Sequence, residues 1–143
     1  MKLHDNERAW LAQLDPAIHL TALHKWLQEF GSPLHLYSER TLQALASGFL
    51  DFAKATARPT NTAFAMKACP NATVLSLLRH RGLLAEVNSE YEYHMARAAG
   101  FAPQQIHING VAKSLALINL ALQQGCRALH VDAVDGDFVQ SPQ

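Results

Sequence analysis

Apolar residues in the N-terminal part of the chain recur at the three- and four-residue spacing typical of amphipathic helices. Asp15-Pro16 predicts the start of one helix and Gly31-Ser32-Pro33 its end, and Ser38 predicts the N-cap of a second helix that reaches about Thr56. Between the two helices, residues 34–37 predict a short strand. The residues expected on the buried sides are Leu20, Leu23, Leu27 and Phe30 in the first helix and Leu42, Leu45, Phe49 and Phe52 in the second.

From residue 62 onward the pattern changes to short apolar runs that alternate with helical segments. Each helical segment opens on a residue that favours the N-cap and closes at a glycine, as helix termini prefer. The caps are Asn71, Ser89 and Ser114, the closing glycines are Gly82, Gly100 and Gly125, and the strands are the run ending at Lys67, Leu84–Val87, Ile106–Ile108 and Ala128–Val131.

This alternation, with a period of about 20 to 22 residues, predicts parallel βαβ units. The fold class is therefore α/β, with about four βα units forming the first half of a TIM-type (β/α)8 barrel after an N-terminal helical segment. We expect a helical lead-in at 1–33, a partial barrel domain at 34–132 and an irregular, truncated tail at 133–143. The tail lacks the period of the next crossover helix, so either the chain is a fragment or its strands form a smaller sheet with a covered edge.

The composition is that of a folded protein, with 49% hydrophobic and 17% charged residues. Twelve basic residues balance twelve acidic ones, which argues against a general binder of nucleic acid or acidic membranes. Eight histidines are scattered without metal-ligand spacing, so we expect no metal site. Two cysteines and the lack of an apolar leader or membrane span indicate a cytoplasmic protein.

The chemistry of the chain centres on one lysine, at the end of the apolar run Thr62–Asn71. Read as a strand with period two, this run places Lys67 on the face of Ala63 and Ala65, opposite Phe64. Two interpretations are open: a strand-end lysine whose head reaches solvent along its stem, or an amine removed from water that acts as an imine-forming nucleophile. The loops after the carboxyl ends of parallel strands carry the active sites of such folds, and Lys67 lies in one of them.

The other predicted strand ends contribute further candidates to the same edge of the sheet. Glu86 is a strand carboxylate that either influences Lys67 or a cofactor, or forms an ordinary salt bridge. Ser89 and Glu92 have the spacing of a helix capping box, and Cys69 is interpreted as a structural cysteine. The segments expected to converge are Lys67–Asn71, Asn88-Ser89, Asn109–Ser114 and Asp132.

The run Phe-Ala-Met-Lys-Ala-Cys-Pro-Asn at 64–71 resembles the lysine motif of the pyridoxal-phosphate decarboxylases with the alanine-racemase fold, also called fold type III. The likeness covers nearly the whole chain from Ser32 onward, with five motifs in order. The other four are Ser-Pro-Leu-His-Leu-Tyr-Ser at 32–38, Val-Asn-Ser-Glu-Tyr-Glu at 87–92, the connection from Ala99 through Ile106–Gly110 to Lys113-Ser114, and Val131-Asp132.

The resemblance implies that Lys67 forms a Schiff base with pyridoxal 5'-phosphate and that Glu86 takes part in binding this cofactor. It also implies a diaminopimelate- or ornithine-decarboxylase-like parent enzyme that removes the α-carboxyl group of a diamino or basic amino acid, as a homodimer. Family members often carry aspartate where Glu86 stands and glycine where Glu90 and Tyr91 stand. The family's ring-stacking histidine, phosphate loops and C-terminal β-domain lie further along the barrel and have no counterpart here.

Two alternatives to this N-terminal part of a decarboxylase stay open. One is a non-catalytic half-barrel that self-associates to cover its exposed strands and helix flank. The other is a relative of the small pyridoxal-phosphate homeostasis proteins, which have a barrel and no β-domain. Whether the isolated chain is itself an enzyme is left undecided by the sequence, since most of the family's cofactor contacts lie outside it.

Overall fold

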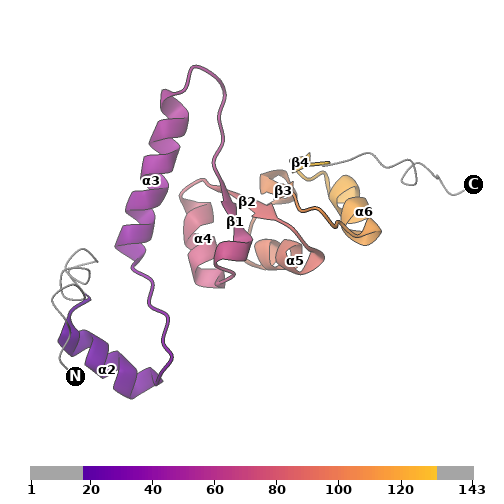
Figure 1. Cartoon of the computed structure of the whole chain (residues 1–143). Helices are drawn as coiled ribbons and strands as arrows, with labels where there is room; N and C mark the ends of the chain where they lie inside the picture. The colour runs from indigo at the N-terminus through magenta and orange to yellow at the C-terminus, as the bar shows by residue number, and fades with distance from the viewer. Residues whose placement is uncertain (1–17, 132–143) are drawn as a thin grey trace, which may run out of the picture. The chain divides into compact units, whose positions relative to one another are not determined.

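A computed structural model of the chain describes residues 18–131, which divide into two compact units between Leu45 and Ala46 (Figure 1). In the first unit, helix α2 (Leu20–Phe30) begins at the N-cap His19, whose ring nitrogen accepts a hydrogen bond of 3.1 Å from the backbone of Ala22. Gly31 ends the helix with φ of 82°, a conformation that favours glycine. The predicted stop is thus confirmed, whereas Asp15-Pro16 lies outside the described residues.

The strand predicted at residues 34–37 is wrong, because these residues have no regular secondary structure. A strand requires a neighbouring strand to satisfy its backbone groups, and no segment of residues 18–131 pairs with this run. Helix α3 (Glu39–Ala55) follows directly, and the hydroxyl of Ser38 accepts a hydrogen bond of 3.1 Å from the backbone of Thr41, as expected of its N-cap.

The second unit contains a parallel sheet of four strands in the order β1-β2-β3-β4, with each strand paired to its neighbours in the sequence. Helices connect the strands, so the predicted βα units of an α/β half-barrel are confirmed. The strands are β1 (Ala63–Ala65), β2 (Leu84–Val87), β3 (Ile106–Ile108) and β4 (Ala128–Leu129), and the helices are α4 (Ala72–His80), α5 (Glu90–Ala98) and α6 (Leu115–Gln124), with short 3-10 helices η1 (Met66–Ala68) and η2 (Pro103–Gln105).

Two strands are shorter than expected, because β1 ends at Ala65 instead of Lys67 and β4 at Leu129 instead of Val131. The predicted N-caps, in contrast, are confirmed for all three connecting helices. The side chain of Asn71 accepts from Thr73 and Val74, that of Ser89 from Glu92, and that of Ser114 from Leu117.

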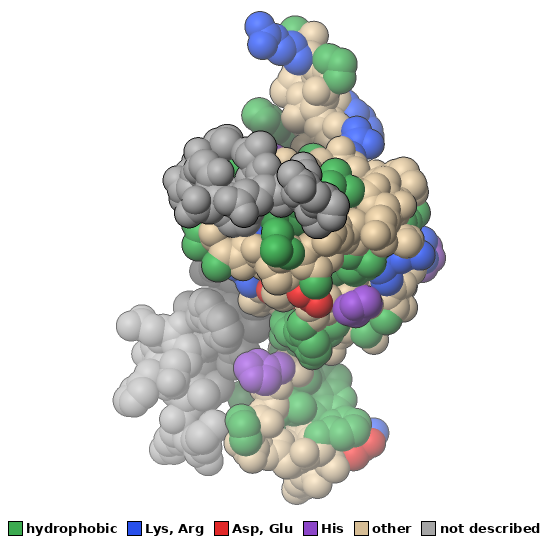
Figure 2. All heavy atoms as spheres, turned by 90° about the vertical axis from the view of Figure 1, so that its right-hand side faces the viewer, with side chains coloured by type: hydrophobic (Ala, Val, Ile, Leu, Met, Phe, Trp, Pro, Cys, Tyr) green, Lys and Arg blue, Asp and Glu red, His purple; other side chains and the backbone are tan. Residues whose placement is uncertain are grey.

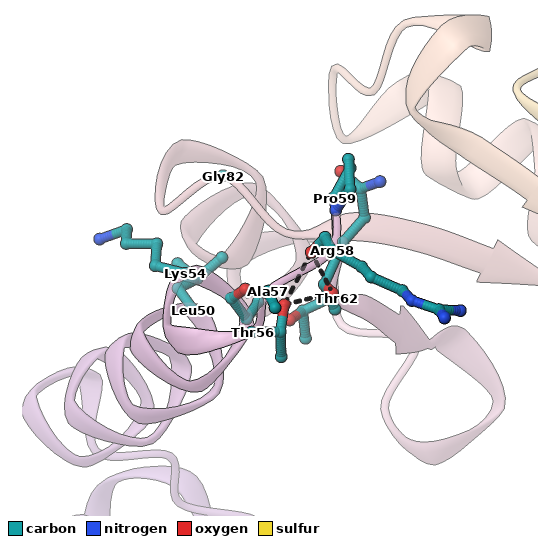
Figure 3. A pocket seen from close by; sticks show the side chains of 11 residues that line it. Leu50, Lys54, Thr56, Ala57, Arg58, Pro59, Thr62 and Gly82 are labelled. Carbon is teal, nitrogen blue, oxygen red and sulfur yellow. Dashed lines mark hydrogen bonds between the residues drawn. The ribbon is translucent and has the colours of Figure 1, made fainter.

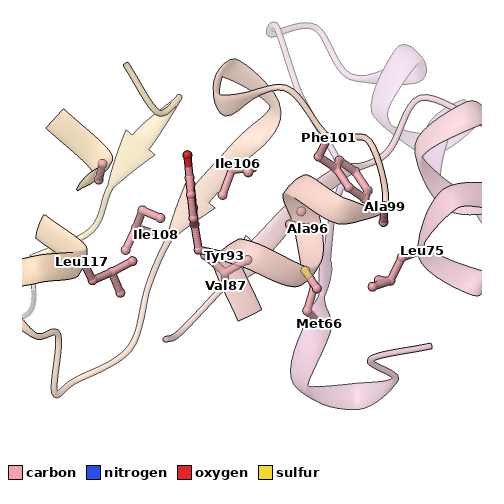
Figure 4. Close-up of a cluster of buried hydrophobic side chains, with 12 residues drawn as sticks. Met66, Leu75, Val87, Tyr93, Ala96, Ala99, Phe101, Ile106, Ile108 and Leu117 are labelled. Atoms are coloured by element: carbon pink, nitrogen blue, oxygen red, sulfur yellow. The ribbon is translucent and has the colours of Figure 1, made fainter. Parts of the chain in front are cut away.

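One face of the sheet packs against the connecting helices and forms the hydrophobic core (Figure 4). Alternate residues of each strand point to this face, which explains why residues two apart in β2 and in β3 are all buried. The core includes Ala85, Val87, Ile106 and Ile108 from the strands, Leu75 from α4, Tyr93 and Ala96 from α5, Leu117 and Ala121 from α6, and Met66 and Phe101 from the connections.

Helix α3 differs from its predicted packing, because the large apolar side chains expected on its buried side are exposed. Leu45, Phe49 and Phe52 are 60%, 62% and 71% exposed, while the small residues Ala46 and Ala53 are buried. The helical spacing predicts which residues share one side of the helix, but these large side chains remain exposed. Exposed hydrophobic side chains are visible among polar ones on the face of the molecule in Figure 2.

Among residues 18–131, every helix is either too short or too polar to span a lipid bilayer.

Candidate functional site

Lys67 lies in the 3-10 helix η1 that follows the carboxyl end of β1. The turn is closed by a hydrogen bond of 3.1 Å from the backbone N–H of Cys69 to the carbonyl of Met66. Met66 and Cys69 point inward and are buried, whereas Lys67 between them is exposed. The turn itself lies against β2 and α5, so it is anchored to the sheet.

This geometry corrects the expectation that Lys67 shares a crowded strand face with Ala63 and Ala65. The chain leaves the strand before Lys67, since Met66–Ala68 form a 3-10 turn in which Met66 is buried and Lys67 is exposed. Within residues 18–131 the side chain of Lys67 is exposed, as the interpretation of a lysine whose head reaches solvent expects. Its amine is therefore accessible to a carbonyl compound.

Glu86 lies on the face of the sheet opposite the core, in a row of side chains that crosses all four strands. The parallel register pairs Ala65 with Glu86, Glu86 with His107, and His107 with Ala128. The side-chain amide of Asn109 donates a hydrogen bond of 3.0 Å to Oε1 of Glu86. The carboxylate is therefore held by a neutral amide instead of the cation that an ordinary salt bridge requires.

The remaining predicted site residues stabilise the loops at the same edge of the sheet. The hydroxyl of Ser89 accepts from the backbone of Glu92 as a capping box requires, but the carboxylate of Glu92 accepts a hydrogen bond of 2.6 Å from the backbone of Asn88 instead of that of Ser89. Ser114 donates to the carboxylate of Glu90, and Lys113 donates to the carbonyl of Gly110. The contact between Ser114 and Glu90 joins the loops after β2 and β3, and the other two stabilise each loop by itself.

Sequence reasoning missed the two histidines of this face. The rings of His107 and His130 lie 5.9 Å apart between centroids, and Nε2 of His107 is buried without a hydrogen-bond partner in the described residues. Burial lowers the pKa of His107, and the nearby His130 and Arg127 lower it further, while Glu86 opposes them. Period-two alternation in Ile106–Ile108 is the signal that places His107 opposite the core.

Asp132, which the sequence placed at the same edge, lies outside the described residues. The cavity in Figure 3 has a volume of about 450 Å³ and lies at the opposite edge, because its lining includes Thr62 before β1 and Gly82 before β2. Its two cationic side chains, Lys54 and Arg58, point in different directions (Figure 3). The cavity is therefore separate from the lysine turn and does not gather positive charge.

Comparison with known proteins gives the family of the chain. The family described as "Pyridoxal-dependent decarboxylase, pyridoxal binding domain" matches residues 42–136. The diaminopimelate decarboxylase of Haemophilus influenzae is 35% identical over 111 residues, which cover 75% of this chain and 25% of that protein. The chain spans about a quarter of the length of the curated relatives that it matches.

Solved structures agree with this family. The crystal structure of diaminopimelate decarboxylase from Helicobacter pylori in complex with L-lysine superposes with a TM-score of 0.66 and 30% identity, covering 78% of this chain and 28% of that one. Lysine/ornithine decarboxylase from Vibrio vulnificus, complexed with putrescine, has a TM-score of 0.66 at 23% identity, over 80% and 30% of the two chains, and so supports the fold alone.

These matches cover the four strands, the helices that connect them and the lysine turn, and they fit the α/β architecture of the first half of a TIM-type barrel. Pyridoxal phosphate is the cofactor that such a domain implies. The chain therefore belongs to the family of pyridoxal-binding domains of pyridoxal-dependent decarboxylases.

Proposed function

We propose that the chain is the N-terminal part of a pyridoxal-phosphate-dependent amino-acid decarboxylase in which Lys67 attaches the cofactor covalently. The observation that carries the proposal is the exposed amine of Lys67 directly after the carboxyl end of the first strand, in a chain of this family. Under this proposal, residues 34–132 form the cofactor-binding half-barrel and residues 1–33 the lead-in.

The donor set fits this cofactor in chemistry. A primary amine is required to bond the aldehyde carbon of pyridoxal phosphate, and Lys67 offers one that is exposed on an anchored turn. Glu86 offers a carboxylate on the face of the sheet beside β1, in register with Ala65 two residues before the lysine. We assign Glu86 to the cofactor site on this basis.

When bound, the cofactor supplies an electron sink that stabilises the carbanion left after loss of carbon dioxide. The roles of the protein residues are attachment and orientation. The turn Met66–Ala68 holds the lysine backbone in place through the buried Met66, so the amine samples a limited region at the edge of the sheet. The carboxylate of Glu86, fixed by Asn109, places negative charge beside that region, which favours cationic groups there.

The proposed substrate is a diamino or basic amino acid. The relatives support this class, because they include diaminopimelate decarboxylases, one of them solved with L-lysine. The proposed location is the cytoplasm, which fits the free thiols of Cys69 and Cys126.

Covalent trapping tests the proposal. The chain is incubated with pyridoxal phosphate, reduced with borohydride and digested, and the modified peptide is identified by mass spectrometry. We expect the label on Lys67, because its amine is exposed on a turn that is anchored to the sheet. Lys67→Arg keeps the positive charge but cannot form the bond, so this variant should lose the label.

Lys54 serves as the matched control, because it is an exposed lysine in the same unit that is paired with Asp51 at 3.1 Å. Lys54→Arg should leave labelling of Lys67 unchanged. Labelling that is spread over all exposed lysines, or that persists at full yield in Lys67→Arg, would contradict the assignment.

A second candidate function is a non-catalytic half-barrel that self-associates as a homo-oligomer. The exposed Phe49 and Phe52 on α3 favour it, because large aromatic side chains at 62% and 71% exposure lose contact with water when two copies pair. This assembly is compatible with cofactor attachment, since Lys67 belongs to a different element.

A further inference from the structure

Asn109 stands directly after β3 and is held there by the backbone. Its N–H donates a hydrogen bond of 2.8 Å to the carbonyl of Val87, which extends the parallel pairing of β2 and β3 by one residue. Side chains alternate along a strand, so Asn109 lies on the same face as His107, two residues earlier. This is the face that carries Glu86.

The turn after Asn109 is also fixed. Gly110 has φ of 94°, and a Cβ at this position would lie 3.2 Å from side-chain and backbone atoms of Asn88. A residue with a side chain would therefore be strained there and would push the ends of β2 and β3 apart. The glycine lets the loop after β3 close onto the end of β2, so Asn109 stays next to Glu86.

We infer that Asn109 is a positioning residue, whose side-chain amide orients the carboxylate of Glu86 for the cofactor site; this inference rests on the proposed function. The bond of 3.0 Å occupies Oε1, and within residues 18–131 Oε2 remains available to accept a hydrogen bond from a proton donor of the cofactor or substrate. An amide performs this role because it donates a hydrogen bond without adding a charge to the site. Aspartate at position 109 has almost the same shape but no donor.

A double-mutant cycle on cofactor affinity tests the inference. Apparent Kd values for pyridoxal phosphate are measured by borohydride trapping at Lys67 in the full chain, in Asn109→Asp, in Glu86→Ala and in the double variant. We expect Asn109→Asp to weaken binding at least about tenfold in the presence of Glu86, since a hydrogen bond to a charged group is lost and a second negative charge repels the carboxylate. In the Glu86→Ala background the same change should have little further effect.

Asn88→Ala is the matched control, because Asn88 is an asparagine at the equivalent end of β2 whose Nδ2 has no hydrogen-bond partner in the described residues. Its effect on the apparent Kd should be the same with and without Glu86. Additive effects of Asn109→Asp and Glu86→Ala would overturn the inference, because they would show that Asn109 acts on folding alone.

A readout without cofactor separates this inference from the proposed function. The side-chain amide signals of Asn109 in a nitrogen–proton correlation spectrum should shift in Glu86→Ala, because their acceptor is removed. Unchanged signals would overturn the positioning role even if Lys67 is labelled. If Lys67 remains unlabelled in the parent chain, the proposed function fails, and with it the role of Asn109 toward the cofactor.

Discussion

At the scale of single residues, the environment of His107 couples stability to pH, because its pKa is lowered in the folded chain. Burial is the main reason that its pKa is lowered, and positive charge from His130 and Arg127 adds to the effect against the opposing carboxylate of Glu86. In the unfolded chain the imidazole regains its ordinary pKa of 6.5. Below that pH the unfolded state binds a proton more readily than the folded state, so folding becomes less favourable.

We therefore predict that stability is highest above about pH 7 and declines as the pH falls through the ordinary pKa of histidine. Urea unfolding at about pH 7.5 and about pH 5.5 measures the decline. His107→Gln should reduce it, because glutamine does not titrate, whereas His94→Gln at an exposed position should retain the decline of the parent chain. An equal decline in His107→Gln and the parent chain would show that another group is responsible.

At the scale of elements, β3 is one of the two central strands of the sheet, because it pairs with both β2 and β4. Ile108 is fully buried in it. Ile108→Ala should lower the free energy of unfolding by about 3 to 4 kcal/mol, since it leaves a cavity, and Ile108→Val by about 1 kcal/mol. Val111, which is 91% exposed, is the control, and Val111→Ala should change stability by less than about 0.5 kcal/mol.

Denaturant titrations of the three variants check this order. A loss for Ile108→Ala as small as that for Val111→Ala would mean that the packing around β3 is looser than the structure indicates.

The elements that were predicted from the sequence are those specified by local signals. Asn71 and Ser114 cap their helices through hydrogen bonds to the backbone of the first turn, which depend only on residues nearby in the sequence. The alternating apolar residues of Ile106–Ile108 likewise predict one buried face of a strand. The strand at 34–37 failed because a strand depends on a partner at a distance. The prediction that the apolar side of α3 is buried was wrong for the same reason, since helical spacing shows which residues share a side but not what covers them.

The candidate site was predicted only in part for a related reason. The family motif identified Lys67, but the 3-10 turn that exposes it ends β1 two residues earlier than the apolar run predicts. The bond between Glu86 and Asn109 joins residues 23 positions apart and depends on the register of two strands. No local pattern in the sequence specifies that register, so the partner of Glu86 was not predicted.

At the scale of the whole molecule, the exposed aromatic side chains of α3 are the feature that favours association. We predict that the average mass measured by light scattering increases with protein concentration, because pairing removes Phe49 and Phe52 from water. The double variant Phe49→Ser, Phe52→Ser should shift this increase to higher concentration. Tyr91→Ser, at a 71% exposed position on α5, is the control and should behave as the parent chain does.

A constant monomer mass at all concentrations would exclude self-association as the way in which α3 is covered.

The order of the sheet also has a consequence for the kinetics of folding. Every strand pairs only with the strands next to it in the sequence, so each pairing closes a loop of about twenty residues. Loops of this length cost little entropy to close, and a sheet with such local pairing folds faster than one whose strands are distant in the chain. The sheet can therefore grow by one βα unit at a time as the polypeptide is synthesised, with β1 and the lysine turn in place before the later strands are added.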